Sequence, residues 1–149
     1  MSCEQDTAGV IRRAGHKLTP QRMMILTALR HAGGHVTASD LLGRVQRDYP
    51  YVDISTVYRT LHTLKQLRLV TETDMGTGDT AYEWARSERH HHLICTACGA
   101  VEEINHEHLD RLGGDIEREY GFRPVLDHFA IFGLCRDCSR AEDQEESDS

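Results

Sequence analysis

With 149 residues, of which 39% are hydrophobic and 28% charged, the chain has the size and composition of one ordinary globular domain or two small ones. No apolar run approaches the roughly 18 residues that a membrane-spanning helix requires. Residues 1–10 are acidic and polar, unlike a secretion signal. We therefore expect a cytoplasmic protein with no membrane partner.

The N-terminal half contains three helix start signals. Thr19-Pro20 begins one helix, because threonine is a good N-cap and proline fits the first helical position. The stretch Thr37-Ala38-Ser39-Asp40 has the pattern of a capping box and begins another. Ser55 is the predicted cap of a further helix, in which apolar residues recur every three or four positions. With a short segment before them, the predicted helices cover residues 10–14, 20–32, 38–49 and 56–67.

A β-hairpin is predicted directly after these helices. Two short runs, at 69–73 and 80–84, flank a glycine-rich turn at 75–79. Helices followed by such a hairpin give the order of a winged helix-turn-helix domain. We assign this domain to residues 1–85.

The C-terminal half predicts a smaller domain of mixed helix and strand. The predicted elements are a hairpin at 93–95 and 100–104, a helix at 106–120 and a strand at 125–132. Leu109 and Leu112 are expected to face inward from the helix. The polar residues 86–89 suit a hinge, so we assign residues 86–140 to this domain. Residues 141–149 are acidic and polar and are expected to form a disordered tail. The fold class is thus α+β, with a winged helix-turn-helix followed by a small α/β domain.

Charge is distributed unevenly along the chain, although its formal net charge is −7. Residues 10–68 carry ten Lys or Arg and three Asp or Glu, a balance of +7, whereas residues 69–149 carry seven and nineteen, a balance of −12. The excess of basic residues favours a phosphate-binding surface on the predicted winged-helix domain. An ordinary solvated surface is the alternative.

Four of the five cysteines form two C-x-x-C pairs, Cys95 with Cys98 and Cys135 with Cys138. Four thiolates in two close pairs suit a tetrahedral Zn²⁺ and leave no open coordination position, so the site is predicted to be structural. Such an ion would join the last predicted strand to the first hairpin of the domain. A redox-active dithiol pair is the alternative. Cys3 has no such partner, and we assign no role to it.

Histidines and carboxylates around the second predicted hairpin suggest another metal site. His90 and His92 share one face of a strand, whereas His91 points to the other. Glu103 lies on the partner strand and Glu83 ends the first hairpin. Nitrogen and oxygen ligands of this kind suit Fe²⁺, Mn²⁺, Co²⁺, Ni²⁺ or Zn²⁺. A histidine run on a plain surface is the alternative.

Several stretches together resemble the ferric uptake regulator (Fur) family over residues 8–139. They are Leu18-Thr19-Pro20-Gln21-Arg22, Ile54-Ser55-Thr56-Val57-Tyr58-Arg59-Thr60-Leu61, His90-His91-His92-Leu93-Ile94-Cys95 and Phe132-Gly133-Leu134-Cys135 with Cys138. The resemblance implies a homodimer that binds double-stranded operator DNA and represses transcription when a regulatory metal ion is bound.

The resemblance also implies positions for the functional residues. The regulatory metal site of the family falls on five residues: His35, Glu83, His90, His92 and Glu103. A third site of many relatives falls on 89, 91, 110 and 127, where Arg89 cannot be a ligand. Its remaining residues here are His91, Asp110 and Asp127, with His128 as a replacement for Asp127. In the winged helix, DNA contacts are implied for Lys17, Tyr58 and Arg59. Core packing is the alternative for Tyr58.

An enzyme is the main rival class of protein. The H-x-E and P-C-x-x-C motifs of zinc deaminases and the H-E-x-x-H motif of metalloproteases are missing from the sequence. A zinc-ribbon module that binds protein is a second rival. Within the family, iron is the expected effector, with nickel, manganese, zinc and peroxide-sensing iron as alternatives. Peroxide-sensing members favour aspartate where this chain has Glu83 and Glu103, and zinc regulators commonly add a cysteine near Ala85.

Overall fold

The computed structural model describes residues 3–85 and 89–147. The chain divides into two compact units, Met1–Arg86 and Ser87–Ser149, and each is described by itself. The sequence predicts a boundary after residue 85 and a hinge at 86–89, of which residues 86–88 lie outside the described part. In the part that the structure describes, no helix is long and apolar enough to cross a membrane.

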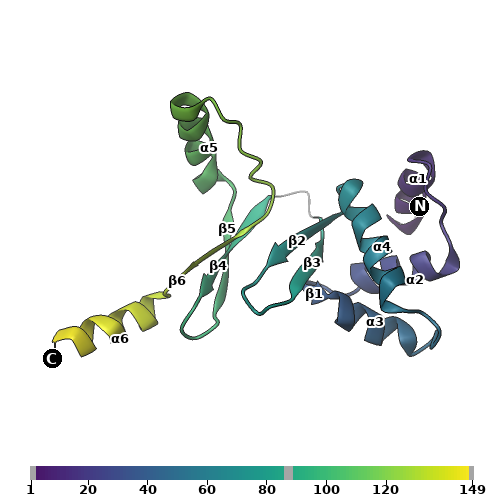
Figure 1. Ribbon diagram of the computed structural model, residues 1–149, viewed down its shortest axis with the longest axis horizontal. Helices are drawn as coiled ribbons and strands as arrows, with labels where there is room; N and C mark the ends of the chain where they lie inside the picture. Colours follow the sequence, from purple (N-terminus) through teal and green to yellow (C-terminus); the bar gives the residue numbers. More distant parts are fainter. Residues whose placement is uncertain (1–2, 86–88, 148–149) are drawn as a thin grey trace. The chain divides into compact units, whose positions relative to one another are not determined.

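The N-terminal unit combines four helices with a three-stranded antiparallel sheet of order β1-β3-β2 (Figure 1). Its elements are α1 (Cys3–Arg13), α2 (Pro20–Arg30), β1 (Val36–Thr37), α3 (Ala38–Gln46), α4 (Ile54–Gln66), β2 (Val70–Asp74) and β3 (Thr80–Trp84). The predicted hairpin is confirmed, and the short β1 adds a third strand by pairing Val36 with Tyr82. The first helix is longer than the predicted 10–14 and ends before Gly15, whose φ of 82° suits glycine.

Local hydrogen bonds explain where the helices of this unit begin. Thr19 accepts from the backbone N–H of Arg22, and Thr37 and Asp40 form the predicted capping box. The prediction for the next helix is wrong by two residues. Asp53, rather than Ser55, caps α4, because its carboxylate accepts from the backbone N–H of Thr56 at 2.7 Å. These caps fix the first residues of α2, α3 and α4.

A single apolar core holds the N-terminal unit together. Ile25 and Leu26 of α2, Leu41 of α3 and Leu61 of α4 are each at most 1% exposed. The inward faces of the three helices also contact the β2–β3 hairpin, which we call the wing, through Val70 and Tyr82. The opposite face of α4 is therefore left to solvent and is available for binding.

The C-terminal unit contains a second three-stranded sheet, of order β5-β4-β6 (Figure 1). Its elements are β4 (His90–Cys95), β5 (Val101–Asn105), α5 (Glu107–Tyr120), β6 (Ala130–Gly133) and α6 (Arg136–Ser147). The predicted hairpin is confirmed as the antiparallel β4–β5 pair, and β6 runs parallel to β4. The central β4 thus carries His90–Cys95 between two partner strands.

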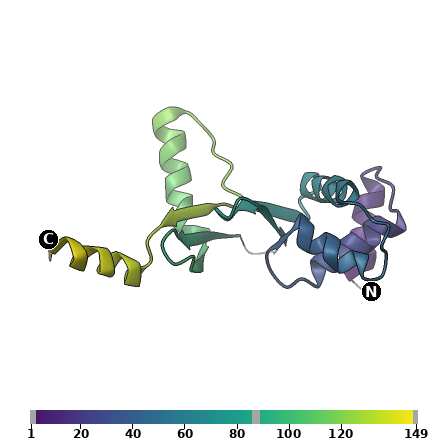
Figure 2. The ribbon, with the colours of Figure 1, turned by 60° about the horizontal axis from the view of Figure 1, so that its bottom comes forward.

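Three predictions for this unit are wrong in detail. The strand expected at 125–132 is confined to β6, which begins at Ala130 opposite His92, and residues 125–129 form no strand. Leu112 is 46% exposed, so α5 buries only Leu109. The tail expected to be disordered from residue 141 instead continues α6 to Ser147, beyond the end of β6 (Figure 2). Its Ala, Glu and Gln residues are good helix formers.

Candidate metal centres and nucleic-acid interface

The four cysteines of the C-x-x-C pairs converge in the C-terminal unit. Cys95 ends β4, Cys98 follows in the turn, Cys135 lies just before α6, and Cys138 lies in the first turn of α6. The parallel pairing of β4 with β6 places Cys95 opposite Gly133, two residues before Cys135. The four sulfur atoms all lie within 4.8 Å of one another, and the Sγ atoms of Cys98 and Cys135 are 3.8 Å apart.

The chemistry of this four-cysteine cluster fits a tetrahedral metal ion. Bonds of ~2.3 Å at tetrahedral angles separate neighbouring sulfurs by about 3.8 Å, the distance seen between Cys98 and Cys135. Backbone N–H groups of Cys135 and Cys98 lower the pKa of Cys95 to about 6. Side-chain hydrogen bonds with Cys135, Cys98 and Cys95 raise the pKa of Cys138 to about 12, because its thiol keeps the proton that it shares with the neighbouring sulfurs. A divalent ion would replace such protons and bind the sulfurs as thiolates.

Three imidazoles form a second cluster in the same unit. Nε2 of His128 lies 3.0 Å from Nε2 of His92 and 3.3 Å from Nε2 of His90. His92 is fully buried, and it pairs in register with Glu103 on β5, so both side chains stand on the same face of the sheet. Three ring nitrogens that point at a common position are arranged as metal ligands would be. His128, expected with His91, instead lies with His90 and His92.

The N-terminal unit contributes a histidine–glutamate pair. Nε2 of His35 lies 3.3 Å from Oε2 of Glu83, and Glu83 is only 5% exposed. The β1–β3 pairing places them together, since Val36 is opposite Tyr82. A buried carboxylate beside an imidazole offers one oxygen and one nitrogen ligand.

The residues predicted for a third metal site do not form one group. His91 is fully buried on the other face of β4, and its Nε2 lies 2.8 Å from Nδ1 of His106. Burial, then the electrostatic effect of nearby His106, lowers the pKa of His91 to about 4. Nε2 of His106 contacts Asp110 at 3.2 Å, whereas Asp127 lies 4.0 Å from Arg89. No motif in the sequence indicates a role for His106, which reaches His91 because β5 pairs with β4 and leads into α5.

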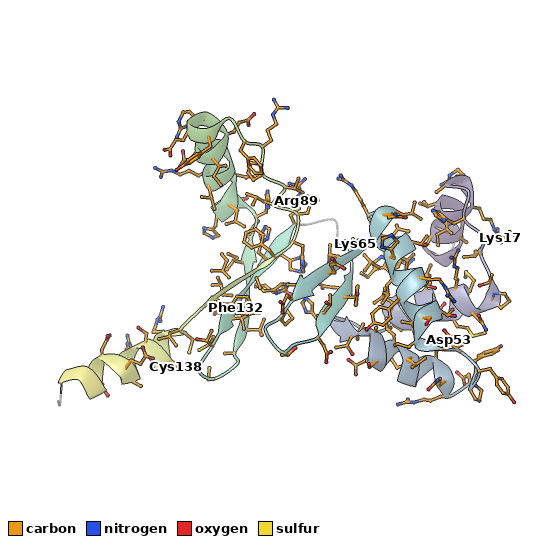
Figure 3. All side chains as sticks on the ribbon, viewed as in Figure 1. Lys17, Asp53, Lys65, Arg89, Phe132 and Cys138 are labelled. Carbon is orange, nitrogen blue, oxygen red and sulfur yellow. The ribbon has the colours of Figure 1, made fainter. Side chains whose placement is uncertain are left out.

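The exposed face of α4 carries the predicted DNA contacts. Tyr58 is 52% exposed, which excludes core packing, and Arg59 is exposed one residue further along the helix. The side chain of Arg59 donates to Thr56 at 3.1 Å. Figure 3 labels Asp53, which caps this helix, and Lys65 towards its other end. Lys65 forms an ion pair with Glu72 of the wing and is therefore neutralised.

Lys17, the other predicted DNA contact, lies in the loop between α1 and α2. Its side chain is exposed, while its carbonyl accepts a hydrogen bond of 2.8 Å from the side chain of Arg22. The hydrogen bond fixes the backbone of this loop and leaves the ammonium group of Lys17 available to a phosphate.

Comparisons with known proteins agree with this architecture. The profile of the ferric uptake regulator family matches residues 13–132. The chain is 34% identical over 137 residues to the ferric uptake regulation protein of Bacillus subtilis, covering 89% of this chain and 91% of that protein. The structure of the ferric uptake regulator of Pseudomonas aeruginosa with manganese matches at 28% identity with a TM-score of 0.69. The match covers 91% of this chain and 99% of that one. A zinc uptake regulator complexed with zinc and DNA matches at 25% identity with a TM-score of 0.62, over 96% and 99% of the two chains.

A winged helix-turn-helix unit followed by an α/β unit with clustered metal-ligating side chains defines a class of metal-responsive transcription regulators. The chain belongs to the ferric uptake regulator family. Members of this family are dimeric DNA-binding regulators rather than enzymes.

Proposed function

We propose that this chain is a homodimeric repressor that binds operator DNA when a regulatory Fe²⁺ ion is bound. The observation that carries the proposal is the clustering of ligand side chains within each unit. One unit supplies the His35–Glu83 pair, with nitrogen and oxygen 3.3 Å apart. The other supplies His90, His92 and His128, with their Nε2 atoms at 3.0 and 3.3 Å. An ion that bound both sets would favour one arrangement of the units over others.

The regulatory ligand set proposed here is His35, Glu83, His90, His92 and Glu103, joined by His128. Glu103 stands beside His92 through the register of β4 and β5. The ion would be the link between the DNA-binding unit and the rest of the chain. Typical coupling free energies of about 1–3 kcal/mol would then change operator affinity by about 5- to 150-fold.

Fe²⁺ is the effector we propose, since a mixture of imidazole and carboxylate ligands suits it and the relative from Bacillus subtilis is named for ferric uptake. Ni²⁺ is the second candidate, because His128 makes the set richer in imidazole than the five positions alone. Mn²⁺ and Zn²⁺ accept the same ligands, so the availability of metal in the cell also contributes to the choice.

The four-cysteine cluster is proposed to hold a structural Zn²⁺ ion. Cys95, Cys98, Cys135 and Cys138 offer the four ligands of a closed site, and closed sites stabilise folds rather than catalyse reactions. The ion would join the end of β4 to the start of α6. A small domain with few buried aliphatic residues needs such a link.

The proposed DNA interface is the exposed face of α4 with the loop before α2. Tyr58 and Arg59 would enter the major groove, and Lys17 would contact the backbone near the minor groove. The excess of basic residues in 10–68 supports this orientation. Operator DNA lies in the cytoplasm, which is accordingly the proposed location.

Exposed apolar residues of the C-terminal unit support the homodimer. Val101 is 49% exposed, Phe132 46% and Ile131 40%, although all three belong to strands of the sheet. A second copy of the chain would remove these side chains from water.

The proposal is tested by measuring operator affinity by fluorescence anisotropy under anaerobic conditions, with and without Fe²⁺. Fragments of the host genome selected by the metal-loaded protein supply the operator. We expect Fe²⁺ to strengthen binding by at least 5-fold. Parallel titrations with Ni²⁺, Mn²⁺ and Zn²⁺ rank the candidate effectors. Equal affinity with and without every one of these ions would overturn the proposal.

A further inference from the structure

Arg89 lies at the centre of a polar cluster on the face of β4 opposite to His90 and His92. One guanidinium nitrogen is 3.2 Å from Nε2 of His106, and the other is 4.0 Å from Asp127. His106 also contacts His91 at 2.8 Å and Asp110 at 3.2 Å. Figure 3 places Arg89 at the start of β4, at the other end of the sheet from Cys138.

The polar atoms of the cluster are already in contact with one another. Nε2 of His106 lies 3.2 Å from the guanidinium group of Arg89, which only donates, and 3.2 Å from a carboxylate oxygen of Asp110, which accepts. Nδ1 of His106 lies 2.8 Å from Nε2 of His91. Both nitrogens of His106 and the facing nitrogen of His91 are thereby engaged, so a metal ion would have to displace these bonds.

Charge opposes a metal ion at this place as well. The guanidinium group of arginine stays protonated in proteins and cannot act as a ligand. Its fixed positive charge is within reach of the same Asp127 and His106 that a metal ion would need. Like charges a few ångströms apart repel, whereas Asp110 and Asp127 already balance the charge of Arg89.

We propose that the Arg89 guanidinium takes the place of a metal ion in the cluster of His91, His106, Asp110 and Asp127. The face of β4 that carries His91 is thus tied to α5 without metal. The chain binds one ion per protomer besides the zinc of the four-cysteine cluster, a count that rests on the proposed regulatory site. Metal response in this chain then depends on a single class of binding site.

The test is to count bound Co²⁺, a spectroscopic probe, on protein that retains its zinc. We expect one Co²⁺ per protomer in the wild type and two in Arg89→Glu, which removes the cation and adds a carboxylate. The matched control is Arg111→Glu on α5, because Arg111 is 92% exposed and makes only a 3.9 Å contact with Asp115. This control variant undergoes the same change in charge and should bind one Co²⁺ per protomer.

A combined variant distinguishes the Co²⁺ site created by Arg89→Glu from the proposed regulatory site. In Arg89→Glu combined with His90→Ala, one Co²⁺ should remain, and a further His106→Ala change should remove it. A wild type that binds no Co²⁺ contradicts the regulatory site, while the difference between Arg89→Glu and Arg111→Glu still tests the role of Arg89. If Arg89→Glu loses zinc, Arg89→His replaces it in the comparison.

Two results would overturn the inference. One is a wild type that already binds a second Co²⁺ which His106→Ala removes. The other is an Arg89 variant, either Glu or His, that keeps its zinc and binds no more Co²⁺ than Arg111→Glu.

Discussion

The two units of this chain are stabilised in different ways. In the N-terminal unit, the fully buried side chains are aliphatic residues such as Leu26, Leu41 and Leu61. In the C-terminal unit, His91 and His92 are fully buried, and the buried hydrophobic residues among those described are Ile94, Cys95 and Leu109. Burial of apolar surface suffices for the first unit. The second unit buries imidazole side chains where a core would be, so its stability depends on the hydrogen bonds and metal contacts that those imidazoles make.

Among the changes that distinguish the two units, loss of one cysteine of the four-cysteine cluster should have the largest effect on stability. We expect Cys98→Ser to release zinc and to unfold or monomerise the C-terminal unit, because structural zinc contributes roughly 10–16 kcal/mol in small zinc domains. Zinc content, sedimentation and thermal melting measure the change. Cys3→Ser, outside the cluster, is the control. A Cys98→Ser protein with unchanged zinc, dimer and melting temperature would exclude the structural role.

A core truncation should affect only the other unit. Leu61 is 1% exposed in the core between α4 and its neighbours, so Leu61→Ala should lower the free energy of unfolding of the N-terminal unit by about 2–5 kcal/mol. Trp84, the only tryptophan in the sequence, belongs to that unit and reports its unfolding by fluorescence. Zinc content should stay at the wild-type level. Loss of zinc in this variant would show that the units do not unfold independently.

Removal of a DNA contact should leave both kinds of stability intact. Arg59→Ala should weaken operator binding by about 1–3 kcal/mol at every metal concentration, through the loss of one base or phosphate contact. Metal affinity should not change. Lys65→Ala is the matched control on the same helix, because Lys65 is already paired with Glu72. Equal losses in the two variants, or none in Arg59→Ala at matched salt, would reject this interface.

Mild acid should weaken the C-terminal unit more than the N-terminal one. Burial holds the pKa of His91 at about 4, below its ordinary value of 6.5. The unfolded chain therefore binds the proton first, and stability present above about pH 6.5 is lost as the pH falls towards 4. Hydrogen bonds lower the pKa values of Asp40 and Asp53 in the N-terminal unit, whose contribution is lost only at lower pH.

Denaturant unfolding at pH 7 and pH 5 measures this difference, with zinc content followed throughout. Trp84 fluorescence reports the N-terminal unit, and circular dichroism reports the whole chain. His91→Gln should flatten the pH dependence of the C-terminal unit while zinc remains bound. An equal pH dependence in His91→Gln and the wild type would show that another group is responsible.

The sequence predicts the elements that depend on local signals such as helix caps and turns. It does not predict the contacts between residues that lie far apart in the chain. Thr19, Thr37 and the hairpin around 75–79 are local, and the structure confirms them. The four-cysteine cluster was predictable because each C-x-x-C pair is itself a local motif. The grouping of His128 with His90 and His92 depends on the path of the loop before β6, and no spacing in the sequence encodes it.

The roles of His106 and Arg89 were missed for the same reason. His106 precedes a helix and looks like a solvated helix start, yet the β4–β5 register brings it to His91. Arg89 could be excluded as a ligand from its chemistry, but its contact with His106 requires coordinates. Leu112 illustrates the opposite error, because helical periodicity identifies an apolar face without showing whether this chain or a second copy covers it.

The most direct test of the account compares His35→Ala with His90→Ala in operator titrations with and without Fe²⁺, alongside metal content. His90→Ala should lose most regulatory metal, because it removes one of three clustered imidazoles. His35→Ala should keep some metal but lose most of the enhancement of about 5- to 150-fold expected for the wild type, since the ion no longer binds the DNA-binding unit through that residue. Both variants should retain the zinc of the four-cysteine cluster. Full metal-dependent enhancement in His35→Ala would contradict the claim that the ion couples the two units.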